Sequence, residues 1–415
     1  MGAELAINGG TPVRAEGLPE RRTYGAEEEV QVLEALRAQN LFSPTGTKVY
    51  DFVRKFARFY GVADVVPSTS GTAAIHVALG TINPEPGSEV IVTPVSDMGS
   101  VAPIILCNCI PVFADVDLET SCLDSNAVAD AITERTRAII VVHCWGRPAE
   151  LDDILTIARE RGIAVIEDCA QSHGVRYKGR LTGTMGDMGA FSCQQSKLIP
   201  CGDGGATIVS DPALAERAHL YVDKGCDWTE DRKYRRQYHF VAPCYRMSEL
   251  QGAVLSAQMD KLAGVVQRRM RLGDALTEQI AGVPGVTPGP PSDPDHGHGY
   301  WHYPLYVDPA VLGAERVDFM RALQAEGVVS HTWMGQPLYM YRSLAEKVTY
   351  GDSHYPFDAR PDVEYGEGLC PNAENVCRTR VVIGLHEGWS ENDVRDVATA
   401  IRKVAVGLAG GQKPR

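Results

Sequence analysis

Apolar and polar positions follow two different periods along the first half of this chain. Apolar side chains recur every three or four positions in residues 26–38 and 49–60, which predicts two amphipathic helices. Short apolar runs rich in β-branched residues predict strands at 90–92, 110–113, 138–142, 164–166 and 206–209. Helical patterns lie between several of these runs, at 70–79, 125–132 and 151–161. This alternation indicates an α/β fold with a mostly parallel sheet covered on both faces.

The pattern changes in the second half of the chain. A long helix is predicted near 247–266, and the Pro- and Gly-rich stretch 284–299 indicates a loop. A smaller α+β part is then predicted from a strand at 303–307, a helix at 317–326, a strand at 380–384 and a helix at 390–406. A chain of 415 residues is long for one simple core. We therefore expect a large domain over 1–265, which includes an N-terminal segment 1–25, and a small C-terminal domain over 266–415.

Composition narrows the possible functions. The formal net charge of −13 argues against broad nucleic-acid binding, which favours a basic surface. We see no apolar run long enough to span a bilayer, and the N-terminus lacks the basic segment and apolar core of a secretory signal. Eleven scattered cysteines with no C-x-x-C pair favour reduced thiols in a cytoplasmic protein. The histidines at 296, 298 and 302 are more typical of a flexible surface loop than of a metal site, so we expect no metal.

Lys197 and Asp168 form the most informative pair in the sequence. Lys197 lies on a Ser- and Gly-rich loop, and Asp168 ends the apolar run that begins at Ile163. A lone lysine is usually a solvated charge, and a lone acid at a strand end is often a helix cap. Together they suit pyridoxal 5'-phosphate, because the amine can form a Schiff base with the aldehyde and the carboxylate can keep the pyridine nitrogen protonated. Ligands of such sheets collect at the carboxyl ends of the strands.

Three further groups of residues could complete this site. Gly71, Thr72 and Ala73 begin a predicted helix, whose free N–H groups favour a phosphate, and Ser192 adds a hydroxyl near the lysine. Gln171 could bond near the ring hydroxyl of the cofactor. His173 could stack or bond nearby, although a structural histidine is about as plausible.

These motifs together resemble the DegT/DnrJ/EryC1/StrS family of sugar aminotransferases. The resemblance rests on the segments 41–46, 69–74, 113–117, 167–174, the lysine loop and 245–251, and it covers nearly the whole chain. It implies fold type I of the pyridoxal phosphate enzymes, with a seven-stranded type of sheet in the large domain. It also implies a homodimer with active sites at the subunit boundary, where Tyr245 and Arg246 would serve the partner's site. Relatives with histidine in place of the lysine perform dehydration, so Lys197 favours an aminotransferase.

The resemblance also implies roles for single residues. Lys197 would carry the cofactor and the proton of the 1,3-shift, and Asp168 would hold the pyridine nitrogen. Two departures stand out. Where members often have an aromatic residue that stacks on the cofactor, this chain has Asp97, so ring packing must come from elsewhere, such as Met98. Cys244 replaces the asparagine that usually reaches the neighbour's phosphate.

The expected reaction moves an amino group from glutamine or glutamate to a keto-cyclitol or keto-sugar of aminoglycoside-type biosynthesis. Residues 5–14, the segment 194–198 and Asp203 are similar to cyclitol aminotransferases that act on scyllo-inosose or 2-deoxy-scyllo-inosose. An alternative acceptor is a nucleotide-diphospho-keto-sugar, for which the basic residues Lys224, Arg232, Lys233, Arg235 and Arg236 could bind the diphosphate. A weaker alternative is a non-catalytic protein that only binds pyridoxal phosphate.

Overall fold

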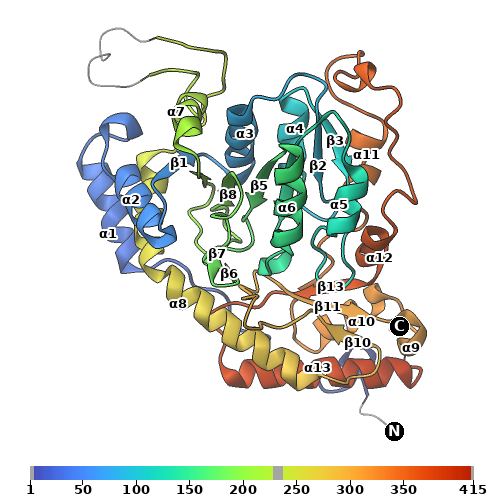
Figure 1. Ribbon diagram of the computed structural model, residues 1–415. Helices are drawn as coiled ribbons and strands as arrows, with labels where there is room; N and C mark the ends of the chain where they lie inside the picture. Colours follow the sequence, from blue (N-terminus) through green and yellow to red (C-terminus); the bar gives the residue numbers. More distant parts are fainter. Residues whose placement is uncertain (1–3, 228–236, 413–415) are drawn as a thin grey trace.

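A seven-stranded sheet forms the centre of the structure, a computed structural model that describes residues 4–227 and 237–412 (Figure 1). Its order is β1-β9-β8-β5-β4-β2-β3. The strands are β1 (Asp64–Ser68), β2 (Glu89–Val92), β3 (Ile110–Phe113), β4 (Thr136–Val142), β5 (Ala164–Asp168), β8 (Met188–Ser192) and β9 (Gly205–Val209). β9 runs antiparallel to both of its neighbours, and the other paired strands are parallel. The predicted mostly parallel sheet is confirmed.

Helices cover both faces of this sheet. They are α1 (Ala26–Arg37), α2 (Lys48–Tyr60), α3 (Gly71–Ile82), α4 (Ala102–Leu106), α5 (Ser125–Ala131), α6 (Leu151–Arg161), α7 (Pro212–Tyr221) and α8 (Glu249–Ile280). Side chains alternate across β4: Ile140 packs in the cluster that contains α3 and α7, whereas Ile139 packs in the cluster that contains α5 and α6. A third cluster packs α2 and α8 against β8 and β9.

A second, antiparallel sheet of order β10-β11-β13-β12 follows α8. Its strands are β10 (Val286–Pro288), β11 (Tyr303–Val307), β12 (Ser330–His331) and β13 (Arg380–Ile383), and its helices are α9 (Pro309–Leu312), α10 (Arg316–Ala325) and α13 (Glu391–Ala409). Leu5 and the end of α8 share the core beneath this sheet. Figure 1 shows α8 running from the large sheet to α13. The predicted domain boundary after residue 265 falls within α8 and stays a prediction.

The segment between β12 and β13 returns to the large sheet and packs on its β3 edge. Tyr339 and Tyr365 each place a ring 5.5 Å from that of Phe113. This segment holds α11 (Arg342–Ala345) and α12 (Pro371–Thr379). The remaining described elements are the hairpin of β6 (Arg176–Tyr177) and β7 (Arg180–Leu181) and short 3-10 turns at Ala6–Asn8, Ser43–Thr45, Met98–Ser100, Cys144–Gly146, Leu338–Met340 and Phe357–Ala359.

Two strands of the seven-stranded sheet and one predicted loop differ from the sequence-based expectations. β8 was not predicted because its sequence, Met-Gly-Ala-Phe-Ser, is poor in β-branched residues, and β1 was not predicted because it contains Pro67. Proline is tolerated there because β1 lies at a sheet edge. The stretch 284–299 contains β10, and the expected surface loop is wrong for His298, which is 1% exposed and stacks on Tyr300.

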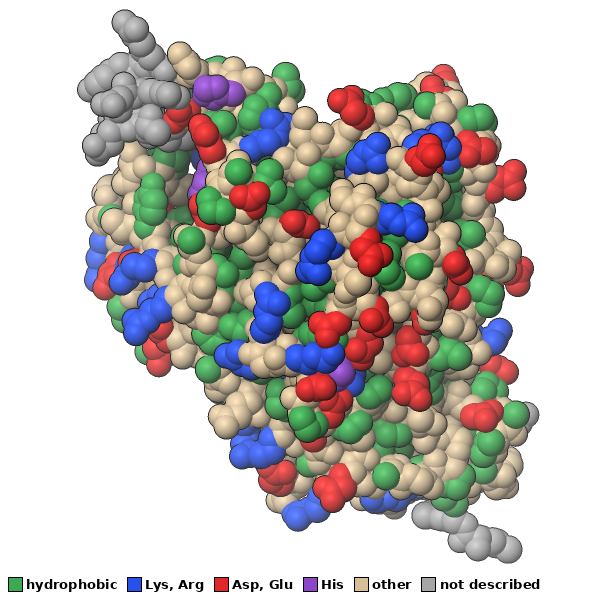
Figure 2. Space-filling model, in the orientation of Figure 1, with side chains coloured by type: hydrophobic (Ala, Val, Ile, Leu, Met, Phe, Trp, Pro, Cys, Tyr) green, Lys and Arg blue, Asp and Glu red, His purple; other side chains and the backbone are tan. Residues whose placement is uncertain are grey.

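The structure shows where the cysteines and the surface charges lie. All eleven cysteines fall within the described ranges and are free thiols, and Cys244 is the exposed one. No helix among the described residues is long and apolar enough to span a membrane. On the face in Figure 2, lysine and arginine side chains are interspersed with aspartate and glutamate. The expected cytoplasmic location stays a prediction.

Candidate active site

A cavity of about 380 Å³ lies at the carboxyl ends of β2, β5 and β8, next to the start of α3. Residues from both halves of the chain line it: Ser70, Gly71, Thr72, Ile75, Ser96, Asp97, Gly99, Ser100, Asp168, Ala170, Gln171, Ser192, Gln194, Ser196, Lys197, Asp203, Trp301 and Trp333. Six of the seven residues predicted for the site therefore line this one cavity. Ala73 does not line it, and its N–H donates to Ser70 Oγ at 3.1 Å.

The amine of Lys197 is buried inside this cavity. The side chain is 9% exposed, and Nζ lies 3.7 Å from the centroid of the Trp301 ring. Trp301 is fixed in turn, because its Nε1 donates to the Ser196 carbonyl at 2.9 Å. Burial lowers the pKa of Lys197 to about 8, although the nearby Asp168 and Asp97 attract the proton. Roughly a tenth of the amine is therefore neutral at pH 7, far more than for an ordinary lysine, and the neutral form is the one a nucleophile requires.

Asp168 is the last residue of β5 and points into the same cavity. Its carboxylate accepts hydrogen bonds from Ser100 Oγ at 2.7 Å and from the Ala170 N–H at 3.0 Å. Burial raises the pKa of Asp168, and these two donors and the amine of Lys197 act in the opposite direction. A cationic ring nitrogen would be a suitable further partner for this buried acid.

The start of α3 forms an anion cradle against the end of β8. The N–H groups of Gly71 and Thr72 belong to the first turn of the helix and have no acceptor within it. A Cβ on Gly71 would lie 2.5 Å from the Cβ of Ser192, so only glycine lets the two elements approach this closely. Two free N–H groups and the Ser192 hydroxyl thus face the cavity together, as a bound phosphate requires.

Gln171 and His173, on the turn after Asp168, lie in different surroundings. Gln171 is at the cavity wall, where its Oε1 accepts from the Trp145 N–H at 2.6 Å and fixes the side chain. The ring of His173 packs 5.5 Å from that of Phe191 and lies outside the cavity lining. Burial lowers the pKa of His173 to about 3. The arrangement favours a structural, neutral histidine over one that contacts a cofactor.

Glu167 holds the turn at residues 183–186 against β5, next to Asp168, and sequence reasoning did not identify this role. Its carboxylate is fully buried and accepts from the N–H groups of Gly183, Met185 and Gly186, each at 2.7 Å. His143 Nε2 lies 3.1 Å away. Because the Ala149 N–H donates to His143 Nδ1, the histidine proton is on Nε2 and bonds Glu167. The sequence signal for this role was the pair of consecutive acids that ends the strand. Side chains alternate along a strand, so the two carboxylates must point to opposite faces of the sheet.

An ion network ties the lysine loop to distant parts of the chain. Arg21 donates to the carbonyls of Lys197 at 2.7 Å and Leu198 at 2.9 Å, and its Nε bonds Glu387 at 2.8 Å. Glu387 also accepts from Arg269 Nε at 2.7 Å, and Arg269 reaches the Tyr300 carbonyl. The N-terminal segment and the second sheet therefore position Lys197 and Trp301. No motif in the sequence marked these residues.

The two departures from the family pattern have structural counterparts. Asp97 lines the cavity, but Met98 does not, so its expected contact with a cofactor ring has no support in the cavity lining. Trp301 and Trp333 do line the cavity, with ring centroids 4.6 Å apart. Sequence reasoning did not single out these tryptophans, because they lie on the second half of the chain outside any recognised motif.

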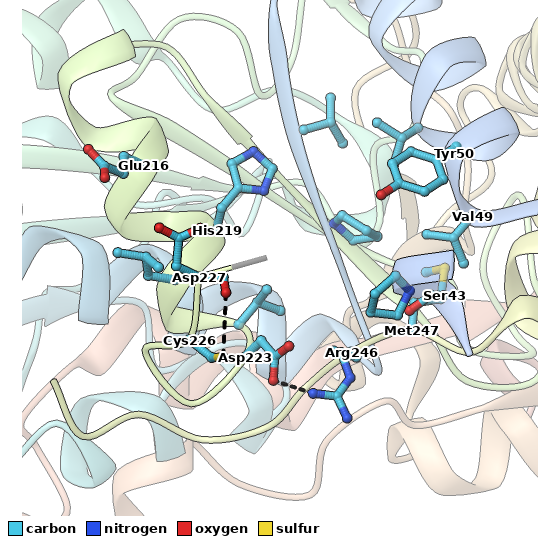
Figure 3. A pocket seen from close by; sticks show the side chains of 16 residues that line it. Ser43, Val49, Tyr50, Glu216, His219, Asp223, Cys226, Asp227, Arg246 and Met247 are labelled. Atoms are coloured by element: carbon cyan, nitrogen blue, oxygen red, sulfur yellow. Dashed lines mark hydrogen bonds and ion pairs between the residues drawn. The ribbon is translucent and has the colours of Figure 1, made fainter. Parts of the chain in front are cut away.

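A second cavity, of about 500 Å³, lies between α2 and α7 (Figure 3). Cys244 comes two residues before Arg246, which lines this cavity. Figure 3 shows Asp223 paired with Arg246 at its floor. Asp223 also bonds Lys224, so this lysine of the predicted basic stretch is neutralised locally. Tyr245 bonds His76 at 2.9 Å. The other members of that stretch, Arg232, Lys233, Arg235 and Arg236, lie outside the described residues.

Comparison with known proteins decides the family. The model of the DegT/DnrJ/EryC1/StrS aminotransferase family matches residues 23–402. The chain belongs to this family. It is thus an aminotransferase, as the lysine loop predicts.

Relatives and a solved structure match over most of the chain. The chain is 33% identical to the L-glutamine:2-deoxy-scyllo-inosose aminotransferase of Streptomyces kanamyceticus, over 97% of each chain. It is 35% identical to the L-glutamine:scyllo-inosose aminotransferase of Streptomyces griseus, over 81% of this chain and 82% of the relative. The crystal structure of the aminotransferase TlmJ from Streptoalloteichus hindustanus superposes with a TM-score of 0.80 at 26% identity, covering 94% of this chain and 98% of that one. The fold-type-I expectation is confirmed.

Proposed function

We propose that this aminotransferase uses pyridoxal 5'-phosphate, held through Lys197, to transfer the amino group of glutamine to a keto-cyclitol. The observation that carries the proposal is the single cavity that joins a buried amine, a buried carboxylate and a helix N-terminus. These groups match the aldehyde, the ring nitrogen and the phosphate of the cofactor. When bound, the cofactor supplies an electron sink that stabilises the negative charge left when a proton is removed from the neighbouring carbon.

The residues around the cavity then have defined tasks. Lys197 would hold the cofactor and, once its amine is released, carry a proton between the two carbons of the 1,3-shift; its pKa of about 8 suits both roles. Asp168 would keep the ring nitrogen protonated. Gly71, Thr72 and Ser192 would bind the phosphate, and Gln171 would orient the ring from its oxygen side. The two tryptophans would shield the site from water.

The charge of the cavity supports a cyclitol acceptor. Among the described residues that line it, Lys197 has the one cationic side chain, whereas Asp97, Asp168 and Asp203 are acidic. Outside the phosphate cradle, a diphosphate would meet the carboxylates of Asp97 and Asp203, whereas the hydroxyl groups of a cyclitol could donate to them. The names of the relatives, glutamine:scyllo-inosose and glutamine:2-deoxy-scyllo-inosose aminotransferases, agree with this acceptor class and with glutamine as donor.

We also propose a homodimer whose active sites lie at the subunit boundary. The apolar second cavity, lined by Val49, Tyr50, Val53 and Met247 among others, offers a surface beside Tyr245 and Arg246. Those two residues would face the partner's site. Size-exclusion chromatography with light scattering tests the dimer directly. A mass near twice 45.0 kDa is expected, and a mass near 45.0 kDa contradicts the proposal.

The function is tested with purified protein loaded with pyridoxal phosphate. Glutamine should convert the visible absorbance of the bound cofactor to that of its aminated form, and scyllo-inosose or 2-deoxy-scyllo-inosose should reverse the change. Turnover only with a nucleotide-diphospho-keto-sugar would show that this sugar, and not a keto-cyclitol, is the acceptor. No spectral change with either glutamine or glutamate would favour a non-catalytic binding protein.

Lys197→Ala is the matched variant for this test. We expect it to abolish turnover, because no second amine lines the cavity among the described residues, while thermal unfolding remains cooperative. Turnover near the wild-type rate in this variant would show that another residue holds the cofactor.

A further inference from the structure

A chain of two buried hydroxyls leads to the carboxylate of Asp168. Ser96 and Ser100 follow β2, and they are 3% and 2% exposed. Ser100 Oγ donates to Asp168 Oδ2 at 2.7 Å, and the two serine oxygens are 2.8 Å apart. Since the Ser100 proton is used on Asp168, Ser96 must be the donor to Ser100. The result is a directed relay, Ser96 to Ser100 to Asp168.

The backbone around Ser100 is built to hold this relay. Asp97 Oδ1 accepts from the Gly99 N–H at 2.8 Å, and the Asp97 carbonyl accepts from the Ser100 N–H at 3.0 Å. A Cβ on Gly99 would lie 2.6 Å from Thr72 Oγ1, so the turn packs tightly on the start of α3. This turn occupies the place where family members often have an aromatic residue. In this chain the segment therefore supplies hydroxyl donors in place of a stacking ring.

We propose that Ser100, held by Ser96, is a positioning residue that keeps the Asp168 carboxylate anionic and aimed at the ring nitrogen of bound pyridoxal phosphate. The proposal rests on the proposed function. Ser100 would not touch the cofactor nitrogen; it acts through Asp168. Of the two hydrogen-bond donors to that carboxylate among the described residues, the Ala170 backbone N–H is present whatever the side chain, so Ser100 is the one that substitution can remove.

Other ionisable groups face Asp168 from the neighbouring elements. Lys197, on the loop after β8, favours its anion, and the neutral ring of His143 lies after β4. Two thiols lie nearby: the hydrogen bond with Cys122 and then burial raise the pKa of Cys144, burial raises the pKa of Cys169, and the charge of Asp168 adds less to each. None of these groups donates a hydrogen bond to the Asp168 carboxylate in the described structure, so loss of the Ser100 hydroxyl leaves one oxygen without its donor.

The test measures binding of pyridoxal phosphate to the cofactor-free protein as a function of pH. For Ser100→Ala we expect the acid limb of binding to move upward by about one pH unit, so that binding at a given pH on that limb is about tenfold weaker, which is the same free energy expressed twice. Ser96→Ala removes only the second donor and should cause a smaller change in the same direction. Ser100→Thr keeps the hydroxyl and should restore the wild-type profile.

Ser330→Ala is the matched control. Ser330 is 2% exposed and donates one hydrogen bond, to the Met320 carbonyl, but lies on β12 away from the cavity. It should leave the profile of cofactor binding against pH unchanged. An acid limb in Ser100→Ala that coincides with that of wild type or of Ser330→Ala would overturn the inference. If the wild-type protein itself binds no pyridoxal phosphate, the proposed function fails instead, so the two failures are distinguishable.

Discussion

Glu387→Gln is predicted to destabilise the protein by about 3 kcal/mol. Glu387 is shared by two arginines, and Arg269 is 1% exposed. Burial alone would raise the pKa of Glu387, but Arg269 and Arg21 lower it to about 2 from its ordinary value of 4.5. This difference corresponds to about 3 kcal/mol at 1.36 kcal/mol per pH unit. It agrees with the roughly 3–5 kcal/mol typical of removing one partner of a buried ion pair.

The effect of Glu387→Gln on the free energy of unfolding should depend on pH. Because the folded-state pKa is depressed, the contribution of Glu387 is complete above about pH 4.5 and is lost as the pH falls through about 2. Glutamine does not titrate. The difference in unfolding free energy between wild type and Glu387→Gln should therefore be full at pH 7 and shrink to roughly half or less near pH 3.

Urea unfolding followed by tryptophan fluorescence measures this difference, since Arg269 donates to the backbone carbonyl of Trp301. Glu391→Gln is the control, because Glu391 pairs with Arg271 at 3.3 Å and both side chains are more than half exposed. Such surface pairs contribute about 0–1 kcal/mol. Equal losses in the two variants at pH 7, or a loss in Glu387→Gln that does not depend on pH, would refute the reasoning.

Two further predictions concern the cavity itself. Capture of pyridoxal phosphate by the cofactor-free protein should accelerate about tenfold per pH unit up to about pH 8 and then level off, because only the neutral amine of Lys197 reacts; stopped-flow absorbance measures it, and a flat profile from pH 6 to 9 would contradict it. Gly71→Ala should weaken cofactor binding at least about tenfold, about 1.4 kcal/mol, because the added Cβ pushes Ser192 out of the cradle. Gly264→Ala, on α8 with nothing within 4 Å, should leave binding unchanged.

Several periodic elements were predictable to within a residue or two, whereas the helix predicted near 247–266 continues to Ile280. Residues 151–161 match α6, and 110–113 match β3. The joint location of Lys197 and Asp168 also followed from the sequence, since strand ends of a parallel sheet converge. β8 was missed because a strand buried on all sides needs little β propensity when tertiary contacts decide.

The distant supports of the site were not predictable from spacing. Arg21 bonds Lys197 across 176 positions, and Trp301 reaches Ser196 across 105. Neither belongs to a motif, and an arginine or tryptophan alone does not indicate its partner. Such contacts depend on how the second sheet and the N-terminal segment pack on the first sheet, which local patterns do not encode.

β5 ends in two acids that point in opposite directions. Asp168 points toward the cavity, and Glu167 points toward the turn at residues 183–186. Loss of a single residue inside this strand would exchange the faces on which the two carboxylates project. The backbone amides would then meet the shorter acid, and the cofactor side would receive the longer one, about one carbon–carbon bond too far forward. The chemistry of this enzyme is consequently tied to the alignment of the same strand that carries apolar side chains into both cores.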